Sequence, residues 1–274
     1  MRECGADPYA NLIQIRSEQM LKELAQSRTR LTGTMLVEFL SPNVPRMLKA
    51  SGFDYFIVDC EHGYFNYESV AHMIAVSKGI GLPVIVRIPD TTRTTILKYM
   101  DMGASGLLVP MVSDPLVLQQ TVEHAKYRPL GKRGVALNRV HAEYIVPDPQ
   151  AYMRRANQET IILGQIETMR GLERLDDIFP VTGVDGMILG PNDLMEDMPV
   201  ADQAAADLLD QAMKAITAAA SRHNKLSGII SSDMGLLQRG MDYGMQLMSW
   251  SSDVRMLMTE ASSGVMRIQG MKMS

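Results

Sequence analysis

Short apolar segments alternate with longer segments of helical periodicity along most of the chain. Several of the apolar segments are continuously hydrophobic rather than alternating, which is typical of parallel strands covered on both faces. We expect eight strands, at Thr34–Phe39, Tyr55–Asp59, Val84–Ile88, Gly106–Pro110, Ile161–Ile166, Gly186–Leu189, Gly228–Ile230 and Gln246–Ser249. Because βα units in this number close into a cylinder, the pattern predicts an α/β fold of the (β/α)8 TIM-barrel type.

Helices are expected between these strands, and capping residues mark several of their ends. Ser41 and Asp114 are candidate N-caps, and Gly103 is a candidate C-terminal stop. The predicted helices are Pro42–Ser51, Thr92–Met102, Pro115–Tyr127 and the alanine-rich Ala201–His223. The connection Arg128–Glu159 contains five proline and glycine residues and is predicted to be a long loop, a feature often associated with function.

The two ends of the chain are predicted to be helical additions to a single barrel domain, residues 1–274. Residues 1–30 form an expected N-terminal extension with a helix at Asn11–Gln26, and residues 251–274 form an expected C-terminal helix. Apolar side chains of the segment Asp253–Ile268 share one helical face, namely Val254, Leu257, Met258, Ala261, Val265 and Ile268. This stripe could pack on its own barrel or be buried against a neighbouring subunit.

Composition and charge narrow the classes of protein. The chain has 274 residues, of which 46% are hydrophobic and 21% charged, as is ordinary for one large globular domain. The formal net charge of −4 argues against nucleic acid or an anionic membrane as the main partner. Cys4 and Cys60 provide no disulfide framework and suit a reducing cytoplasm. The first 30 residues lack the apolar core of a signal peptide, and the apolar stretches are too short to span a bilayer.

Polar side chains follow four of the predicted strands. They lie in Asp59-Cys60-Glu61-His62, at Arg87, in Gln165-Ile166-Glu167-Thr168 and in Gly190-Pro191-Asn192-Asp193. Active sites of such barrels lie at the C-terminal ends of the strands. Because charged groups directly after apolar strands are costly unless they are paired or functional, the four strand ends predict one common site.

Glu167 and Asp193 are carboxylates at the ends of adjacent predicted strands. Converging carboxylates repel one another unless a cation lies between them. The pair fits Mg²⁺ or Mn²⁺ held by two protein ligands together with water and substrate. The alternative is structural, with Asp193 as a helix N-cap and Glu167 in an ion pair.

His62 is the one histidine predicted at a strand end, and its neighbours Asp59 and Glu61 favour a general base over a packed histidine. Arg87 could stabilise a developing oxyanion, or it could simply pair with Glu61 or Asp59. Cys60 is expected to fill the core. The turns after the last two strands lack the glycines of a phosphate cradle, which disfavours phosphorylated substrates.

These residues carry a resemblance to the HpcH/HpaI aldolase family. The similar stretches run in order from Gly33 to Leu257: residues 53–62, 86–87, 101–112, 131–134, 165–168 and 183–194. The resemblance implies a barrel of the phosphoenolpyruvate/pyruvate type. It also implies a class II pyruvate aldolase, related to the 2,4-dihydroxyhept-2-enedioate and 2-keto-3-deoxy-sugar-acid aldolases.

The same resemblance implies roles for individual residues. Glu167 and Asp193 would bind the divalent metal, Mg²⁺ or Mn²⁺ with Co²⁺ as a further option. Gln165 and the backbone of Gly190 and Asn192 would hold the pyruvate carboxylate. Arg87 would stabilise the enolate oxygen, and His62, next to Asp59, would be the base.

Asp101 matches a family aspartate that raises the basicity of this histidine. It ends a predicted helix on the opposite face of the barrel. It could therefore reach only the His62 of a neighbouring subunit, which implies a homo-oligomer, and the resemblance favours a hexamer.

The leading hypothesis is reversible aldol cleavage of a 4-hydroxy-2-oxo acid to pyruvate and an aldehyde. Oxaloacetate decarboxylation, or another condensation of the pyruvate enolate, would use the same site. An acyl-CoA lyase of the citrate-lyase type and a non-catalytic metabolite-binding barrel remain as further alternatives. Asn192, the turn 250–253 and the aromatic turn 63–67 depart from the usual family pattern, so the aldehyde is left open.

Overall fold

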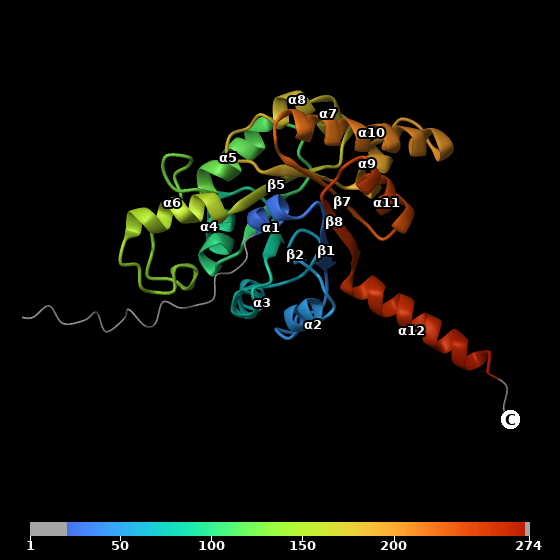
Figure 1. Cartoon of the computed structure of the whole chain (residues 1–274), viewed down its shortest axis with the longest axis horizontal. Helices are drawn as coiled ribbons and strands as arrows, with labels where there is room; N and C mark the ends of the chain where they lie inside the picture. The colour runs from blue at the N-terminus through green and yellow to red at the C-terminus, as the bar shows by residue number, and fades with distance from the viewer. Residues whose placement is uncertain (1–20, 272–274) are drawn as a thin grey trace, which may run out of the picture.

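Eight parallel strands close into a barrel in a computed structural model that describes residues 21–271 (Figure 1). The strands are β1 (Leu31–Leu36), β2 (Tyr55–Asp59), β3 (Val84–Arg87), β4 (Gly106–Val109), β5 (Ile161–Ile166), β6 (Gly186–Leu189), β7 (Leu226–Ser231) and β8 (Leu247–Ser252). Every neighbouring pair is parallel, and β8 pairs with β1 to close the cylinder. The predicted (β/α)8 barrel is confirmed.

Three strands, β2, β5 and β6, have the predicted bounds, and the largest error is in β1. Val37–Phe39 was predicted as the end of that strand, yet β1 ends at Leu36. The carboxylate of Asp253 accepts hydrogen bonds from the backbone N–H groups of Val37, Glu38 and Phe39, at 2.8–3.1 Å. These donors therefore do not bond to a neighbouring strand.

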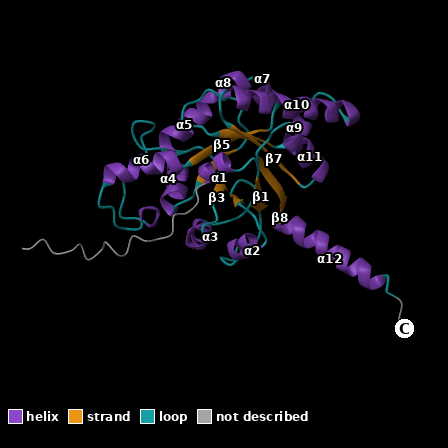
Figure 2. Ribbon diagram, in the orientation of Figure 1, coloured by secondary structure: helices purple, strands orange, loops and turns teal. Residues whose placement is uncertain are grey.

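Helices surround the barrel, as Figure 2 shows. They are α1 (Leu21–Ser27), α2 (Val44–Ala50), α3 (Tyr67–Ile80), α4 (Arg93–Met102), α5 (Pro115–Ala125), α6 (Pro149–Glu159), α7 (Met169–Glu173), α8 (Leu175–Ile178), α9 (Pro191–Asp197), α10 (Asp202–Arg222), α11 (Met234–Asp242) and α12 (Asp253–Gln269). The predicted cap Asp114 accepts from the N–H of Leu116 at 2.9 Å, and Gly103 ends α4 in a left-handed conformation. Ser41 is not a cap, because α2 begins at Val44 after Asn43.

The prediction of one long loop at Arg128–Glu159 was wrong. This connection contains a short 3-10 helix, η1 (Val140–Ala142), and the whole of α6. On α6 only Asn157 is buried, so the helix lacks the apolar stripe by which a helix is recognised in a sequence. The Asn157 side chain instead bonds to both the N–H and the carbonyl of Tyr127, which fixes α6 to the end of α5.

The interior of the barrel is filled at its N-terminal end. Leu21, Leu24 and Ala25 of α1 pack with inward-facing side chains of the strands, so α1 covers this opening. Gly33 leaves the space that the ring of Tyr55 occupies, since a Cβ at position 33 would lie 2.3 Å from that ring. Inside the barrel, a ligand is therefore expected only at the C-terminal end of the strands. Positions 11–20 of the predicted helix Asn11–Gln26 lie outside the described residues.

The C-terminal helix α12 extends away from the barrel (Figure 1). Its Leu257, Met258, Val265 and Ile268 are each 53–67% exposed, so packing of this stripe on its own barrel is wrong. Burial against a neighbouring subunit stays a prediction. Within residues 21–271, no helix has the length and apolar character needed to cross a membrane.

Candidate active site

The ends of β2 and β3 place a buried ion pair at the mouth of the barrel. Asp59 and Arg87 are register neighbours, and Arg87 binds the carboxylate through Nε at 2.9 Å and Nη2 at 2.6 Å. Burial tends to lower the pKa of Arg87, but the hydrogen bonds and charge of Asp59 outweigh it and raise that pKa. Asp59 Oδ1 also accepts from the backbone N–H of Glu61 and of His62, at 3.1 and 3.2 Å. One carboxylate therefore holds both the guanidinium and the following turn.

Glu61 connects Arg87 to His62. Its Oε2 lies 3.3 Å from Arg87 Nη1 and 4.0 Å from His62 Nε2. Partial burial raises the pKa of Glu61, although the charges of Arg87 and His62 act to lower it. The His62 side chain is 71% exposed and is held through its backbone rather than through a bond to its ring. The predicted proximity of Asp59 and Glu61 to His62 is thus confirmed. Arg87 forms the ion pair considered as its structural alternative, and it does so with both acids.

Glu167 follows β5 and is almost fully buried. Its Oε2 accepts from the N–H of Met111 at 3.0 Å, and its Oε1 accepts from Gln165 Nε2 at 2.6 Å. Among the described residues no lysine or arginine nitrogen lies within 4 Å of this carboxylate, so the ion pair considered as an alternative is absent there. Burial raises the pKa of Glu167 to about 7. The hydrogen bond from the Met111 N–H and the charge of Arg87 lower this pKa, whereas the charge of Asp193 raises it further.

Gly190, at the end of β6, allows β6 to approach these side chains closely. A Cβ at this position would lie 2.5 Å from Glu167 Oε1 and 2.8 Å from Gln165 Nε2. Gln165 is buried, and its Oε1 has no hydrogen-bond partner among residues 21–271. The site thus contains a buried acceptor oxygen next to a buried carboxylate.

Asp193 lies in the first turn of α9, and Gly190 rather than Asp193 is the N-cap of that helix. The N-cap alternative for Asp193 is therefore wrong. Asn192 and Asp193 are both exposed, and the charge of Asp193 raises the pKa of Glu61 and of Glu167. Three carboxylates thus act on one another across the mouth. In the described part of the chain no group of three or more His, Cys, Asp and Glu is arranged to hold a metal ion, and the pair Glu167 and Asp193 stays a prediction.

The family model for HpcH/HpaI aldolase/citrate lyase matches residues 35–259. The chain belongs to this family. It is 31% identical to the hydroxypyruvate/pyruvate aldolase of Roseovarius nubinhibens, over 80% of this chain and 85% of that one. It is 29% identical to the 5-keto-4-deoxy-D-glucarate aldolase of Klebsiella pneumoniae, over 78% and 83%.

The fold of this family member is also that of solved relatives. The crystal structure of the HpcH/HpaI aldolase from Desulfitobacterium hafniense DCB-2 superposes with a TM-score of 0.88 at 32% identity, covering 92% of this chain and 98% of that chain. A 2-keto-3-deoxy-L-rhamnonate aldolase of Salmonella gallinarum is 28% identical over 77% of this chain and 78% of that one.

Asp101 is not part of the same group of side chains. It lies near the C-terminus of α4, where Arg133 Nη2 binds its carboxylate at 2.7 Å and His141 Nδ1 lies 3.2 Å from its carbonyl oxygen. The predicted pairing of Asp101 with a histidine base stays a prediction that requires a second subunit. Cys60 packs in the layer between strands and helices, as expected.

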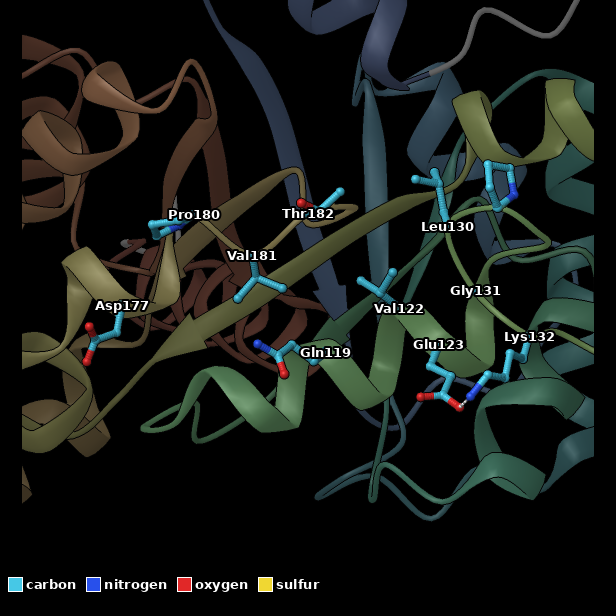
Figure 3. A pocket seen from close by; sticks show the side chains of 11 residues that line it. Gln119, Val122, Glu123, Leu130, Gly131, Lys132, Asp177, Pro180, Val181 and Thr182 are labelled. Carbon is cyan, nitrogen blue, oxygen red and sulfur yellow. Dashed lines mark hydrogen bonds and ion pairs between the residues drawn. The ribbon is translucent and has the colours of Figure 1, made fainter.

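A pocket of about 500 Å³ lies away from these strand ends, between the end of α5, residues 129–132 and residues 177–182 (Figure 3). Its walls include one exposed ion pair, Lys132 with Glu123 at 2.7 Å. None of the predicted site residues lines it. The charged strand ends, rather than this pocket, are the candidate active site.

Sequence reasoning missed the contribution of Met111. Its backbone N–H binds Glu167, and the residue has a left-handed φ of 52°. Strained backbone of this kind is common at functional sites. The apolar run through Pro110 and Met111 gives no signal for such a donor.

Proposed function

We propose that the chain catalyses the reversible, metal-dependent aldol cleavage of a 4-hydroxy-2-oxo acid to pyruvate and an aldehyde. Family membership and aldolase-named relatives make it a carbon–carbon lyase of the class II pyruvate aldolase type. The observation that carries the proposal is the meeting of the Asp59–Arg87 pair with Glu167 and Asp193 at one end of the barrel.

The residues at the mouth fit a hard divalent cation. Glu167 is a buried carboxylate with no cationic partner among the described residues, and the charge of Asp193 raises its pKa. Gln165 Oε1 is a buried acceptor without a donor among the described residues. Oxygen ligands of this kind suit Mg²⁺ or Mn²⁺, with Co²⁺ as a further option. Glu167 and Asp193 would hold the ion. When bound, it would supply Lewis-acid polarisation of the 2-oxo group.

Arg87 would stabilise the enolate oxygen that forms as the bond breaks. Three of its N–H groups face Asp59 and Glu61, which fixes the plane of the guanidinium and leaves the others for substrate oxygens. Asp59 would therefore act as a positioning residue for Arg87. A donor fixed before the reaction needs no reorganisation as charge develops.

His62 would take the proton of the 4-hydroxyl group as the C3–C4 bond breaks. The electrons of that bond pass into the pyruvate enolate, the aldehyde leaves, and C3 is protonated to complete the reaction. The exposed ring of His62 can exchange its proton with solvent, and Glu61 lies 4.0 Å away.

Gln165 and the backbone of Gly190 and Asn192 would hold the substrate carboxylate. Gln165 Nε2 donates to Glu167 in this structure, so it would have to exchange this bond on binding substrate.

We also propose a homo-oligomer, a hexamer by the family resemblance, in which α12 packs on another subunit. The support is the exposed apolar stripe of α12 and the position of Asp101, which lies near the C-terminus of α4, whereas His62 follows the C-terminal end of β2. Sedimentation velocity tests it: a monomer at micromolar concentration would contradict the proposal. Replacing Leu257 and Ile268 together by glutamate should dissociate the assembly. The cytoplasmic location and the single-domain organisation of residues 1–274 stay predictions.

Hydrogen–deuterium exchange at the pyruvate methyl group, followed by NMR, tests the enolate-forming step without a choice of aldehyde. We expect exchange with Mn²⁺ or Mg²⁺ and none with EDTA. Exchange that persists in EDTA, or in a variant lacking both Glu167 and Asp193, would contradict the metal-dependent mechanism. No exchange with any metal would contradict the aldolase itself.

A further inference from the structure

Charge is unevenly distributed around the mouth of the barrel. Moving from β2 to β6, the strand ends carry the groups of the candidate site, including Asp59, Arg87 and Glu167. The remaining arc consists of β7, β8 and β1, which are neighbours in the closed sheet. We call this part the β7–β8–β1 arc, and it comprises residues 226–233, 247–253 and 31–43.

Inward-facing side chains of the β7–β8–β1 arc are uncharged. Met35, Val37 and Ile230 pack with the apolar cluster inside the barrel. Ser249 is buried and its hydroxyl lies 2.8 Å from the hydroxyl of Tyr55. Ser232 is partly exposed in the turn after β7. Where the arc is partly exposed, at Val37, Ile230 and Ser232, it therefore presents aliphatic and hydroxyl groups.

No lysine, arginine or histidine occurs in any of the three segments of this arc. Its charged residues are all acids. Asp253 binds the backbone N–H groups of residues 37–39, and Asp233 caps α11 by accepting from Gly235 and Leu236. Glu38 is exposed. An anion placed over this arc would meet negative charge and no counter-charge from these segments.

From this asymmetry we infer that the aldehyde partner is uncharged, with the pyruvate unit held by the charged strand ends and the aldehyde lying over the β7–β8–β1 arc. The inference rests on the proposed aldolase function and narrows its substrate class. Among the relatives, the names include an aldolase for a glucarate derivative and one for a rhamnonate derivative, which by chemical nomenclature are a dicarboxylate and a monocarboxylate. The arc favours the second kind for this chain, because its aldehyde product would bear no carboxylate.

The reaction in the synthetic direction is a balanced addition that needs no further reactant. The pyruvate methyl group loses a proton, the enolate carbon bonds to the aldehyde carbon, and the aldehyde oxygen takes up a proton. Only the substituent of the aldehyde differs between substrates, so kcat/KM for two aldehydes of equal length compares their recognition directly.

The test compares butanal with succinic semialdehyde. Both aldehydes have four carbons, but the end away from the aldehyde group is a methyl group in butanal and a carboxylate in succinic semialdehyde. With saturating pyruvate and Mn²⁺, we expect kcat/KM for butanal to be higher by about tenfold or more, and glyceraldehyde to behave as butanal does. Equal values, or a preference for succinic semialdehyde, would overturn the inference. Pyruvate methyl exchange measured in parallel separates the two claims, because its absence overturns the aldolase function and the inference with it.

A charge-introducing variant gives a second measurement. Ser232→Arg adds a cation to the arc outside the proposed catalytic groups. It should raise kcat/KM for succinic semialdehyde relative to butanal by about tenfold at low salt, and lose much of that gain at about 0.5 M salt. Ser232→Gln is the matched uncharged control. An equal effect of both variants on both aldehydes would contradict recognition by charge at this arc.

Discussion

Replacing Gly190 by alanine should damage the site while leaving the fold intact. The added Cβ would lie 2.5 Å from Oε1 and 2.6 Å from Cγ of Glu167, and 2.8 Å from Gln165 Nε2. Ordinary carbon contacts begin at 3.4 Å, so the Glu167 carboxylate must move by about 1 Å. A displacement of this size at a reacting centre can reduce the rate by about 10²-fold.

The assay is metal-dependent exchange of the pyruvate methyl protons, together with Mn²⁺ affinity and thermal unfolding. Gly79→Ala in α3 is the matched control, because nothing lies within 4 Å of the added Cβ and alanine is the better helix former. We expect full activity in the control and about a hundredfold loss in Gly190→Ala. Exchange within about threefold of the wild type would refute the reasoning that Gly190 sets the position of Glu167.

Two further perturbations test single side chains. Arg87→Lys keeps the positive charge but cannot bind Asp59 through two nitrogens, so methyl exchange should fall by about 10²–10³-fold, and an undiminished rate would show that Arg87 does not stabilise the enolate. Lys126 is buried, donates to the carbonyls of Asn157 and Thr160, and has its pKa lowered by burial from 10.5 to about 7. Between these values the unfolded chain binds more protons, so the contribution of Lys126 to stability rises with pH. From pH 7 to pH 9, urea unfolding should show the wild type gaining about 2 kcal/mol relative to Lys126→Met, and parallel pH profiles would contradict it.

Much of the barrel could be predicted because its signals are local. Strands buried on both faces give continuous apolar runs wherever they occur, and caps such as Asp114 and Gly103 act within a few residues. The site could be predicted in part because barrel topology brings all the strand ends to one mouth. Once the ends of the second and third strands were correctly predicted, Asp59 and Arg87 could be placed as neighbours.

Contacts between distant segments could not be predicted. Asp253 accepts hydrogen bonds from the backbone of residues more than 200 positions earlier, and β1 ends just before these residues. The Met111 N–H reaches Glu167 through a left-handed backbone conformation that its sequence does not require. The helix α6 is fixed by the amide of Asn157 rather than by an apolar face. Each of these depends on polar pairing, which has no sequence period.

The mouth of the barrel carries more negative than positive charge, and this has a consequence for stability. Asp59 is matched by Arg87, but Glu167 and Asp193 have no cation beside them in the described structure. Burial raises the pKa of Glu167 from 4.5 to about 7. Between these values the native state binds more protons than the unfolded state. The stability that this carboxyl contributes is therefore complete below about pH 4.5 and is lost as the pH rises through 7.

Glu167→Gln should accordingly make the metal-free protein more stable at about pH 8, by up to about 3 kcal/mol from a shift of this size. The amide keeps an acceptor for the Met111 N–H, and rotation of the Gln165 side chain would offer its unpartnered oxygen to the new donor. The same variant should lose the stabilisation that Mn²⁺ gives the wild type, about 2.7 kcal/mol at a hundred times the dissociation constant. Unfolding with and without Mn²⁺ measures both effects. A variant less stable than the wild type without metal would contradict the claim that the ionised, buried Glu167 destabilises the fold. A variant that Mn²⁺ stabilises as much as the wild type would show that Glu167 is not a metal ligand.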